Sequence, residues 1–192
     1  MALKESTMLA LGTPMPDFAL PDVRTQVIIS SETFQNKKTL LVMFICRHCP
    51  YVVHVQDELT KLARDYKEKD LGIVGISSND VSKYPADSPL CLKEMAEQLK
   101  WTFPFCYDES QSVAKTFTAA CTPDFFVYDA HRRLVYRGQL DDSRPGNAKP
   151  VTGQDLRAAL DAALAGKPVE SHQRPSAGCN IKWKPGNEPE YA

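Results

Sequence analysis

The residues best suited to chemistry in this sequence are Cys46 and Cys49, which are separated by Arg47 and His48. A thiolate is a nucleophile and a metal ligand, and two closely spaced thiols can form and break a disulfide. The pair directly follows an apolar run, residues 39–45, and is itself followed by a proline that suits the first turn of a helix. A C-x-x-C motif in a βαβ context predicts redox chemistry or metal binding rather than a structural cross-link.

The position of the motif predicts different roles for its two sulfurs. At the N-terminus of a helix, unpaired N–H groups and the helix dipole favour an anion, so we expect the pKa of Cys46 to lie below the free-thiol value of about 8.5. His48 can add positive charge or a hydrogen bond, and Cys49 is expected one helical turn further on and more buried. We predict that an accessible Cys46 attacks a disulfide and that Cys49 resolves the mixed disulfide, a cycle that needs no cofactor.

Two other interpretations of the dithiol remain open. One is a metal-binding or redox-sensing interaction module, and the other is a pair of inert buried thiols. Zinc usually takes four ligands, typically from two such pairs. The sequence has no second C-x-x-C, and the nearby imidazoles, His48 and His54, share one segment with the thiols. We therefore favour redox chemistry and predict no metal ligands.

The elements that must position the dithiol follow from hydrophobic patterning. Buried strands are predicted at residues 39–45, 71–76, 125–128 and 134–137. Helices are predicted over about 50–66 and 89–100, in a short segment that contains Val113, Ala114 and Phe117, and from a capping box at Thr152 to Gly166. This order predicts an α/β fold with a central mixed sheet flanked by helices, parallel in its first half and closed by a hairpin in its second. We expect a single domain over residues 1–192, with a core of about 12–165 and an irregular C-terminal tail over 166–192.

The Thr122–Pro123 step lies just before the predicted strand at residues 125–128. Most X-Pro bonds are trans, and about 5–6% are cis. A cis bond here would turn the Thr122 backbone toward the dithiol, ready to pair with a bound peptide by strand addition. Position along the chain leaves both isomers open.

The other cysteines give weaker signals. Cys121 lies close to the Thr-Pro step and is either an alternative disulfide partner for Cys46 or, as we favour, a small core residue. Cys179, in the tail, could fold back as a resolving thiol, although we favour a buried or idle thiol. We predict that Cys91 and Cys106 are structural.

The composition excludes several classes of protein. Of the 192 residues, 43% are hydrophobic and 24% are charged, which is typical of a soluble globular chain. Lys and Arg number 23 against 24 Asp and Glu, so the net charge of −1 gives no electrostatic case for nucleic acid or a membrane surface. No apolar run approaches the roughly 18–20 residues of a membrane span, and the N-terminal segment lacks the apolar run of a secretory signal. We expect no nucleic-acid or membrane partner and a cytoplasmic location.

Taken together, these motifs resemble the thioredoxin superfamily over roughly residues 12–165, with a strand, a C-x-x-C and a helix followed later by Thr-Pro before a hairpin. Residues 12–18 look like the alkyl hydroperoxide reductase and thiol-specific antioxidant branch, that of the peroxiredoxins and their relatives. Further segments are similar to a peroxiredoxin-like group of the thioredoxin family, namely residues 44–51, 121–126, 136–142 and 178–184. The resemblance implies a thioredoxin-like fold with extra N-terminal strands, and Pro123 as the family's cis-proline.

The resemblance also implies an enzyme of cell redox homeostasis. It would be a thiol–disulfide oxidoreductase whose site residues are Cys46, His48, Cys49, Thr122 and Pro123. Its substrates would be protein or small-molecule disulfides, and its electron donor a thiol system such as thioredoxin reductase or glutathione. The alternative is a thiol-dependent peroxidase, an antioxidant that acts on peroxide as the peroxiredoxins do.

The sequence departs from both kinds of relative at the site. Peroxiredoxins carry a P-x-x-x-T-x-x-C signature, and with Cys49 in its last position Cys46 replaces the threonine and Val42 the proline. The arginine expected near residues 125–128 is also missing. Thioredoxins carry Trp before the first cysteine and Gly-Pro inside the motif, where this chain has Ile45 and Arg-His. A central His resembles the oxidising dithiol enzymes, so we expect a potential less reducing than the roughly −270 mV of thioredoxin.

Overall fold

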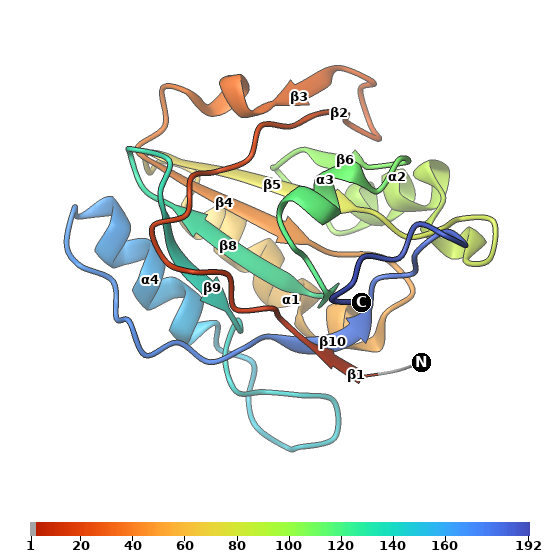
Figure 1. Cartoon of the computed structure of the whole chain (residues 1–192). Coiled ribbons are helices and arrows are strands. Elements are labelled where there is room, and N and C mark those ends of the chain that lie inside the picture. The colour runs from red at the N-terminus through yellow and green to blue at the C-terminus, as the bar shows by residue number, and fades with distance from the viewer. Residues whose placement is uncertain (1–2) are drawn as a thin grey trace.

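The central sheet has five strands in the order β6-β5-β4-β8-β9, in a computed structural model that describes residues 3–192 (Figure 1). Its strands are β4 (Thr39–Phe44), β5 (Leu71–Ser77), β6 (Phe105–Tyr107), β8 (Asp124–Tyr128) and β9 (Leu134–Gly138). β5 is parallel to β4 and β6, whereas β8 is antiparallel to both β4 and β9. The predicted mixed sheet, parallel in its first half and ending in a hairpin, is confirmed.

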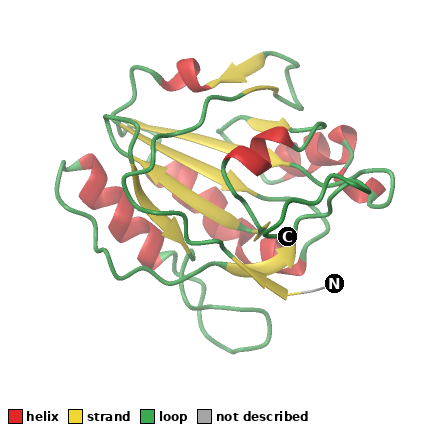
Figure 2. Ribbon diagram, viewed as in Figure 1, coloured by secondary structure: helices red, strands yellow, loops and turns green. Residues whose placement is uncertain are grey.

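Helices flank the sheet, as Figure 2 shows. They are α1 (Pro50–Asp65), α2 (Pro89–Gln98), α3 (Ser112–Thr116) and α4 (Gln154–Leu164), with short 3-10 turns η1 (Ser31–Phe34) and η2 (Pro85–Asp87). Side chains of α1, α2 and α4 join the core on one face of the sheet, and those of α3 join the core on the other. The predicted α/β class is therefore confirmed. Within residues 3–192, each helix is too short or too polar to cross a bilayer.

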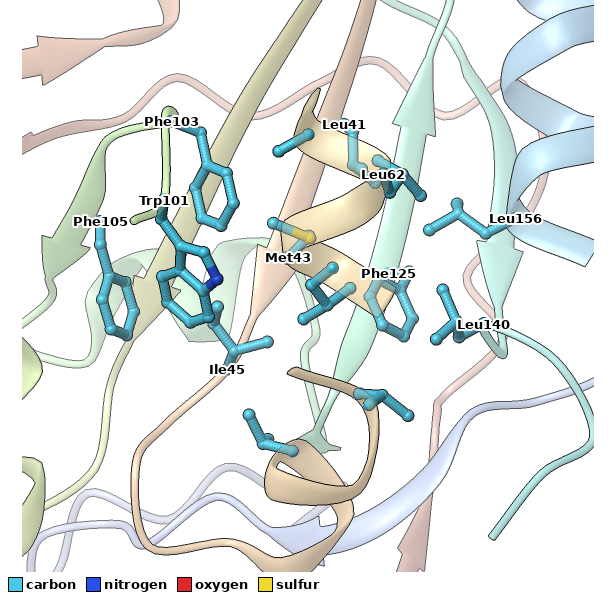
Figure 3. Close-up of a cluster of buried hydrophobic side chains, with 14 of the residues drawn as sticks. Leu41, Met43, Ile45, Leu62, Trp101, Phe103, Phe105, Phe125, Leu140 and Leu156 are labelled. Carbon is cyan, nitrogen blue, oxygen red and sulfur yellow. The ribbon is translucent and has the colours of Figure 1, made fainter. Parts of the chain in front are cut away.

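Strand β4 anchors the site because all of its residues are buried. Its side chains alternate between the two cores, with Leu41 and Met43 on one face and Leu40 and Val42 on the other. Figure 3 shows the first core, where Leu41, Met43 and Ile45 pack among aromatic rings of neighbouring segments. A strand packed on both faces has little freedom to move. The residues that follow it, including the dithiol, therefore start from a fixed point.

Helix α1 begins where the sequence predicts. Pro50 is its first residue, a position where a proline loses no helical hydrogen bond. The predicted apolar stripe is buried at Val52, Val55, Leu59 and Leu62. Because this stripe packs against the core that also receives β4, the N-terminus of α1 lies at the carboxyl edge of the sheet.

A second, smaller sheet joins three distant parts of the chain. It contains β1 (Leu3–Glu5), β10 (Ala177–Asn180) and β7 (Cys121–Thr122), with β10 in the middle and antiparallel to both neighbours. Figure 1 shows β1 and β10 side by side. The prediction of an irregular tail is wrong for Ala177–Asn180. Those four residues have no β-branched side chain and include a glycine, so only their partners make them a strand.

The extra N-terminal strands implied by the family resemblance are also present. One is β1, and the others are β2 (Ala19–Pro21) and β3 (Ile28–Ser30), which pair with each other in an antiparallel hairpin. The N-terminal segment from Leu3 onward therefore belongs to the folded structure.

Candidate active site

The dithiol lies in the short connection between β4 and α1, as predicted. Cys46 follows the last residue of β4 by two positions, and Cys49 is the N-cap of α1. Cys49 is therefore not one turn inside the helix, as expected, because Pro50 is already the first helical residue. The backbone N–H groups of Val52 and Val53 each donate to the Cys49 carbonyl at 3.0 Å. These bonds fix the Cys49 backbone at the start of the helix.

The Thr122–Pro123 bond is cis, as the family resemblance implies. It places Thr122 against both sulfurs. Cys49 Sγ lies 3.2 Å from the Thr122 carbonyl oxygen, and Cys46 Sγ lies 3.4 Å from the Thr122 hydroxyl. The two sulfurs are also hydrogen-bonded to each other. The structure thus brings together four of the predicted site residues.

Both sulfurs are buried. Cys46 is 1% exposed and Cys49 is 0% exposed, so the prediction of an accessible Cys46 is wrong. The reason lies outside the motif, because segments far along the chain pack over the β4–α1 connection. An external molecule can reach either sulfur only after a covering segment moves.

The acidities of the two thiols are the reverse of the prediction. Burial raises the pKa of Cys46 well above its usual value, and the hydrogen bond to Cys49 and the nearby Asp87 carboxylate raise it further. The hydrogen bond from Cys46 lowers the pKa of Cys49 to about 5, against the opposing effect of burial. Near neutral pH the reduced pair therefore carries its proton on Cys46 and a thiolate on Cys49.

Asp87, the last residue of η2, occupies the anion position that the prediction assigned to Cys46. Its Oδ1 accepts the backbone N–H groups of Arg47 at 2.8 Å and of His48 at 3.1 Å, and its Oδ2 accepts the Asn79 amide at 2.8 Å. Burial by itself would raise the pKa of Asp87, but hydrogen bonds from His48 and Asn79 hold it below its usual value. The N–H groups before α1 thus bind a carboxylate, and the adjacent Cys46 thiol stays protonated.

Asp87 was not predicted as a site residue from the sequence. The available signal is its place in the loop after β5, at the carboxyl edge of the sheet where α/β proteins gather their ligand-binding residues. Nothing in the spacing of this loop connects it with the dithiol, because the contact depends on how η2 folds back over the sheet edge.

His48 is held by the same carboxylate. Its Nδ1 bonds to Asp87 Oδ2, and its ring stacks on Tyr84 with centroids 4.9 Å apart. A carboxylate on one ring nitrogen sets the tautomer and orientation of the imidazole. A ring nitrogen of His48, the Cys46 sulfur and an Asp87 oxygen lie within 4.8 Å of one another. His48 therefore lies beside Cys46, as predicted, but its direct hydrogen-bond partner is a carboxylate.

The cluster of Cys46, His48 and Asp87 contains the donor types of a metal site. However, the two oxygens of Asp87 already bind two backbone N–H groups, the His48 ring and the Asn79 amide. A metal ion would have to break at least one of these buried bonds. The geometry thus favours a hydrogen-bonded carboxylate over a metal ligand.

Cys179 is buried, as predicted, and it lies beside the dithiol. Strand β10 places it opposite Thr122, and its thiol is hydrogen-bonded with Cys49. The edge of Thr122 at which a bound peptide was expected to pair is therefore occupied by the chain's own strand. Cys121 instead directs its sulfur to the Pro123 carbonyl at 3.6 Å and is fully buried, which suits the predicted core role.

The fold and the site together define a protein of the thioredoxin superfamily, with a cis-proline facing a dithiol at the end of a central strand. More closely, the chain belongs to the Redoxin family, whose model matches residues 10–156. The peroxiredoxin-like resemblance seen in the sequence is therefore confirmed at the level of the family.

Two solved structures are similar over nearly the whole chain. An uncharacterized conserved protein from Geobacillus kaustophilus is 52% identical, with a TM-score of 0.95 and coverage of 97% of this chain and 98% of that one. A hypothetical protein from Sinorhizobium meliloti is 48% identical, with a TM-score of 0.93 and coverage of 95% and 99%. A thiol:disulfide interchange protein from Chlorobium tepidum, 18% identical with a TM-score of 0.61 and coverage of 81% and 98%, shares the fold. No curated protein matches the chain.

Proposed function

We propose that the protein is a thiol–disulfide oxidoreductase in which Cys46 and Cys49 cycle between a dithiol and a disulfide. The observation that carries the proposal is that both sulfurs lie against Thr122 at the cis-Pro123 step, with Cys49 Sγ 3.2 Å from its carbonyl oxygen and Cys46 Sγ 3.4 Å from its hydroxyl. The lowered pKa of Cys49 favours a thiolate there. Exchange requires such a thiolate within reach of a second sulfur. Membership of the Redoxin family supports the same chemistry.

In the proposed cycle, the Cys49 thiolate, rather than the Cys46 predicted from the sequence, attacks one sulfur of the substrate disulfide. The substrate S–S bond breaks, and the leaving thiolate takes the proton from Cys46. Cys46 then attacks Cys49 and displaces the second substrate sulfur, which solvent protonates. The substrate gains two electrons and becomes two thiols, while the protein loses two electrons and holds the Cys46–Cys49 disulfide.

The unequal acidities suit the return half of this cycle. A thiol of low pKa is the better leaving group in exchange. A donor thiolate would therefore attack Cys46 and release Cys49, whose pKa is about 5. This donor would be glutathione or a thioredoxin reductase system, as the family resemblance implies.

The covering of the site favours a small disulfide over an extended polypeptide. A peptide cannot add to the edge of Thr122 unless it first displaces β10, and both reactive sulfurs are buried. A compact disulfide needs a smaller opening than a strand does. We therefore propose a substrate of the size of glutathione disulfide.

The test is reduction of glutathione disulfide by the full chain, with the protein reduced beforehand. Cys46→Ser and Cys49→Ser should each lower turnover by at least about 100-fold, because each removes one sulfur of the cycle. Cys91→Ser alters a half-buried cysteine outside the pair and should leave the rate unchanged. A redox titration with peptide mapping should yield the Cys46–Cys49 disulfide. An unaltered rate in the first two variants, or no such disulfide at any potential, overturns the proposal.

A thiol-dependent peroxidase is the second candidate, favoured by the low pKa of Cys49 at the N-cap of α1. In the comparison with peroxiredoxins, Cys49 takes the place of the peroxide-reducing cysteine. Its thiolate would attack one peroxide oxygen and become a sulfenic acid as water leaves, and Cys46 would then condense with it to a disulfide and a second water. The double variant Cys46→Ser/Cys179→Ser, which lacks both neighbouring thiols, should then let dimedone label Cys49 after peroxide treatment. Peroxide consumption no faster than that of free cysteine removes this candidate.

A further inference from the structure

Strand β10 fills the edge of the strand that carries Thr122. In the antiparallel register, Cys179 lies opposite Thr122 and Asn180 opposite Cys121. The two strands approach very closely at Gly178, where an added Cβ would lie only 2.0 Å from the Thr122 carbonyl oxygen. Any side chain larger than that of glycine would push β10 away. The close contact therefore depends on the residue that directly precedes Cys179.

Hydrogen bonds on both sides of Cys179 hold this strand in place. Before it, the Ser176 hydroxyl donates to the Pro123 carbonyl at 2.6 Å. After it, the backbone N–H of Ile181 donates to the Ala120 carbonyl at 3.1 Å. The thiol of Cys179 is thus positioned by neighbours that are bound to the cis-proline segment itself.

Cys179 meets the dithiol at Cys49. The Cys179 thiol and its backbone N–H both hydrogen-bond to the Cys49 sulfur, and Cys49 is also bonded to Cys46. Cys179 is 3% exposed, so this contact is as buried as the dithiol. Three sulfurs therefore form a chain of contacts in which Cys49 is the middle member.

We propose that Cys179 is a third redox thiol, which can replace Cys46 as the disulfide partner of Cys49. The proposal rests on the thiol–disulfide activity proposed above. In the step, Cys179 attacks the Cys49 sulfur of the Cys46–Cys49 disulfide, so the Cys49–Cys179 bond forms and the Cys46–Cys49 bond breaks. Cys46 leaves as a thiolate and takes up the proton that Cys179 has lost. No electrons enter or leave the protein, because one disulfide replaces another.

The exchange has two structural consequences. The Cys49–Cys179 disulfide would fix β10 covalently to the N-terminus of α1, and Cys46 would be left as a lone thiol. The oxidising equivalent would then be stored on the C-terminal strand, away from the carboxylate of Asp87 that lies beside Cys46. The dithiol would gain a second disulfide state without a second substrate.

The test is disulfide mapping of the full chain after oxidation with glutathione disulfide, acid quenching and non-reducing digestion. In Cys46→Ser, whose oxidation is slow and is therefore followed to its end point, most molecules should finally contain the Cys49–Cys179 disulfide. In the double variant Cys46→Ser/Cys179→Ser, Cys49 should instead keep glutathione as an unresolved mixed disulfide. The wild-type chain should give both the Cys46–Cys49 and the Cys49–Cys179 peptides, and this measurement requires no substitution.

Retention of glutathione on Cys49 in Cys46→Ser, with Cys179 still reduced and no Cys49–Cys179 peptide from the wild type, overturns the proposal. That result leaves the Cys46–Cys49 cycle intact if the wild-type chain still forms its disulfide. Conversely, absence of the Cys46–Cys49 disulfide from the wild type overturns the proposed activity, whatever Cys179 does. The two failures are therefore distinguishable in one set of digests.

Discussion

The two sides of the dithiol differ in what they present to the sulfurs. On the η2 side, Cys46 faces the buried carboxylate of Asp87, which disfavours a second negative charge. On the β10 side, Cys49 faces hydrogen-bond donors, including the thiol and backbone N–H of Cys179. The same four-residue motif therefore holds one thiol and one thiolate. Segments distant in sequence, rather than the start of the helix, determine which cysteine is the thiol and which is the thiolate.

Among the substitutions, Gly178→Ala, which displaces β10, is expected to have the largest effect on stability. The new Cβ would lie 2.0 Å from the Thr122 carbonyl oxygen, so β10 must move away. We expect a loss of about 3 kcal/mol in the free energy of unfolding, and a higher pKa for Cys49 as Cys179 withdraws. Urea denaturation and the pH dependence of alkylation measure these two effects.

The control for this change is Gly146→Ala, where no atom lies within 4 Å of the new Cβ but φ is +87°. That substitution should cost only about 1 kcal/mol, from the positive φ. Equal losses of unfolding free energy in the two variants would mean that the close approach of β10 to β7 contributes nothing to stability.

Breaking the η2 side with Asp87→Asn should have the next largest effect. The amide oxygen can still accept the Arg47 and His48 N–H groups, but the charge beside Cys46 is gone. We expect a lower pKa for Cys46 and a loss of about 2 kcal/mol in stability, since buried bonds to a charged group are weakened. Alkylation of Cys46 against pH, followed by mass mapping, checks the first effect. Asp57→Asn, on the exposed face of α1, is the control and should change neither quantity.

A sharper form of the comparison removes the Cys46 thiol, which donates a hydrogen bond to Cys49. Cys46→Ala should raise the pKa of Cys49 from about 5 by at least about one unit, equivalent to roughly 1.4 kcal/mol. Cys46→Ser keeps a hydroxyl donor and should raise it less. The thiolate absorbance at 240 nm, followed against pH, gives both values. If both variants keep the wild-type pKa, the sulfur–sulfur bond is not the cause of the acidity.

Besides these substitutions, the acidity of Cys49 predicts a pH dependence of stability in the reduced protein. The folded pKa of Cys49, about 5, lies below its unfolded value of about 8.5. Its stabilisation is therefore complete above about pH 8.5 and is lost as the pH falls toward 5. Cys46 has the opposite shift, so stability should decline again above about pH 8.5.

Urea midpoints from pH 5 to 10 for the wild type and Cys49→Ser check this dependence. Subtracting the two curves removes the contribution of Asp124, whose pKa burial raises to about 7 and which both proteins retain. Curves that run parallel from pH 5 to 8.5 would mean that Cys49 is not acidic in the folded chain.

The parts of the site that the sequence predicted depend on local patterns. Strand β4 is marked by an unbroken apolar run, and α1 by a proline at its first residue followed by a helical stripe. The cis state of Pro123 followed from the family resemblance and is confirmed. Each of these features is indicated by a sequence pattern within a few residues of it.

The parts that were missed depend on contacts between remote segments. Cys179 lies in a strand without β-sheet propensity, which forms only because β1 and β7 pair with it. Asp87 reaches the dithiol only through the folding of η2. The predicted low pKa of Cys46 was wrong for the same reason, because the pKa of a thiol depends on the charges and burial that the folded chain places around it.

The pairing of β1 with β10 has a practical consequence for anyone who prepares this protein. Leu3–Glu5 cover the outer edge of the strand that carries Cys179. Removing them would leave that edge unprotected, and an unprotected edge can recruit a strand from another copy. A bulky N-terminal affinity tag should therefore be cleaved before redox assays. Such a tag would extend from β1, which pairs directly with the strand that carries Cys179.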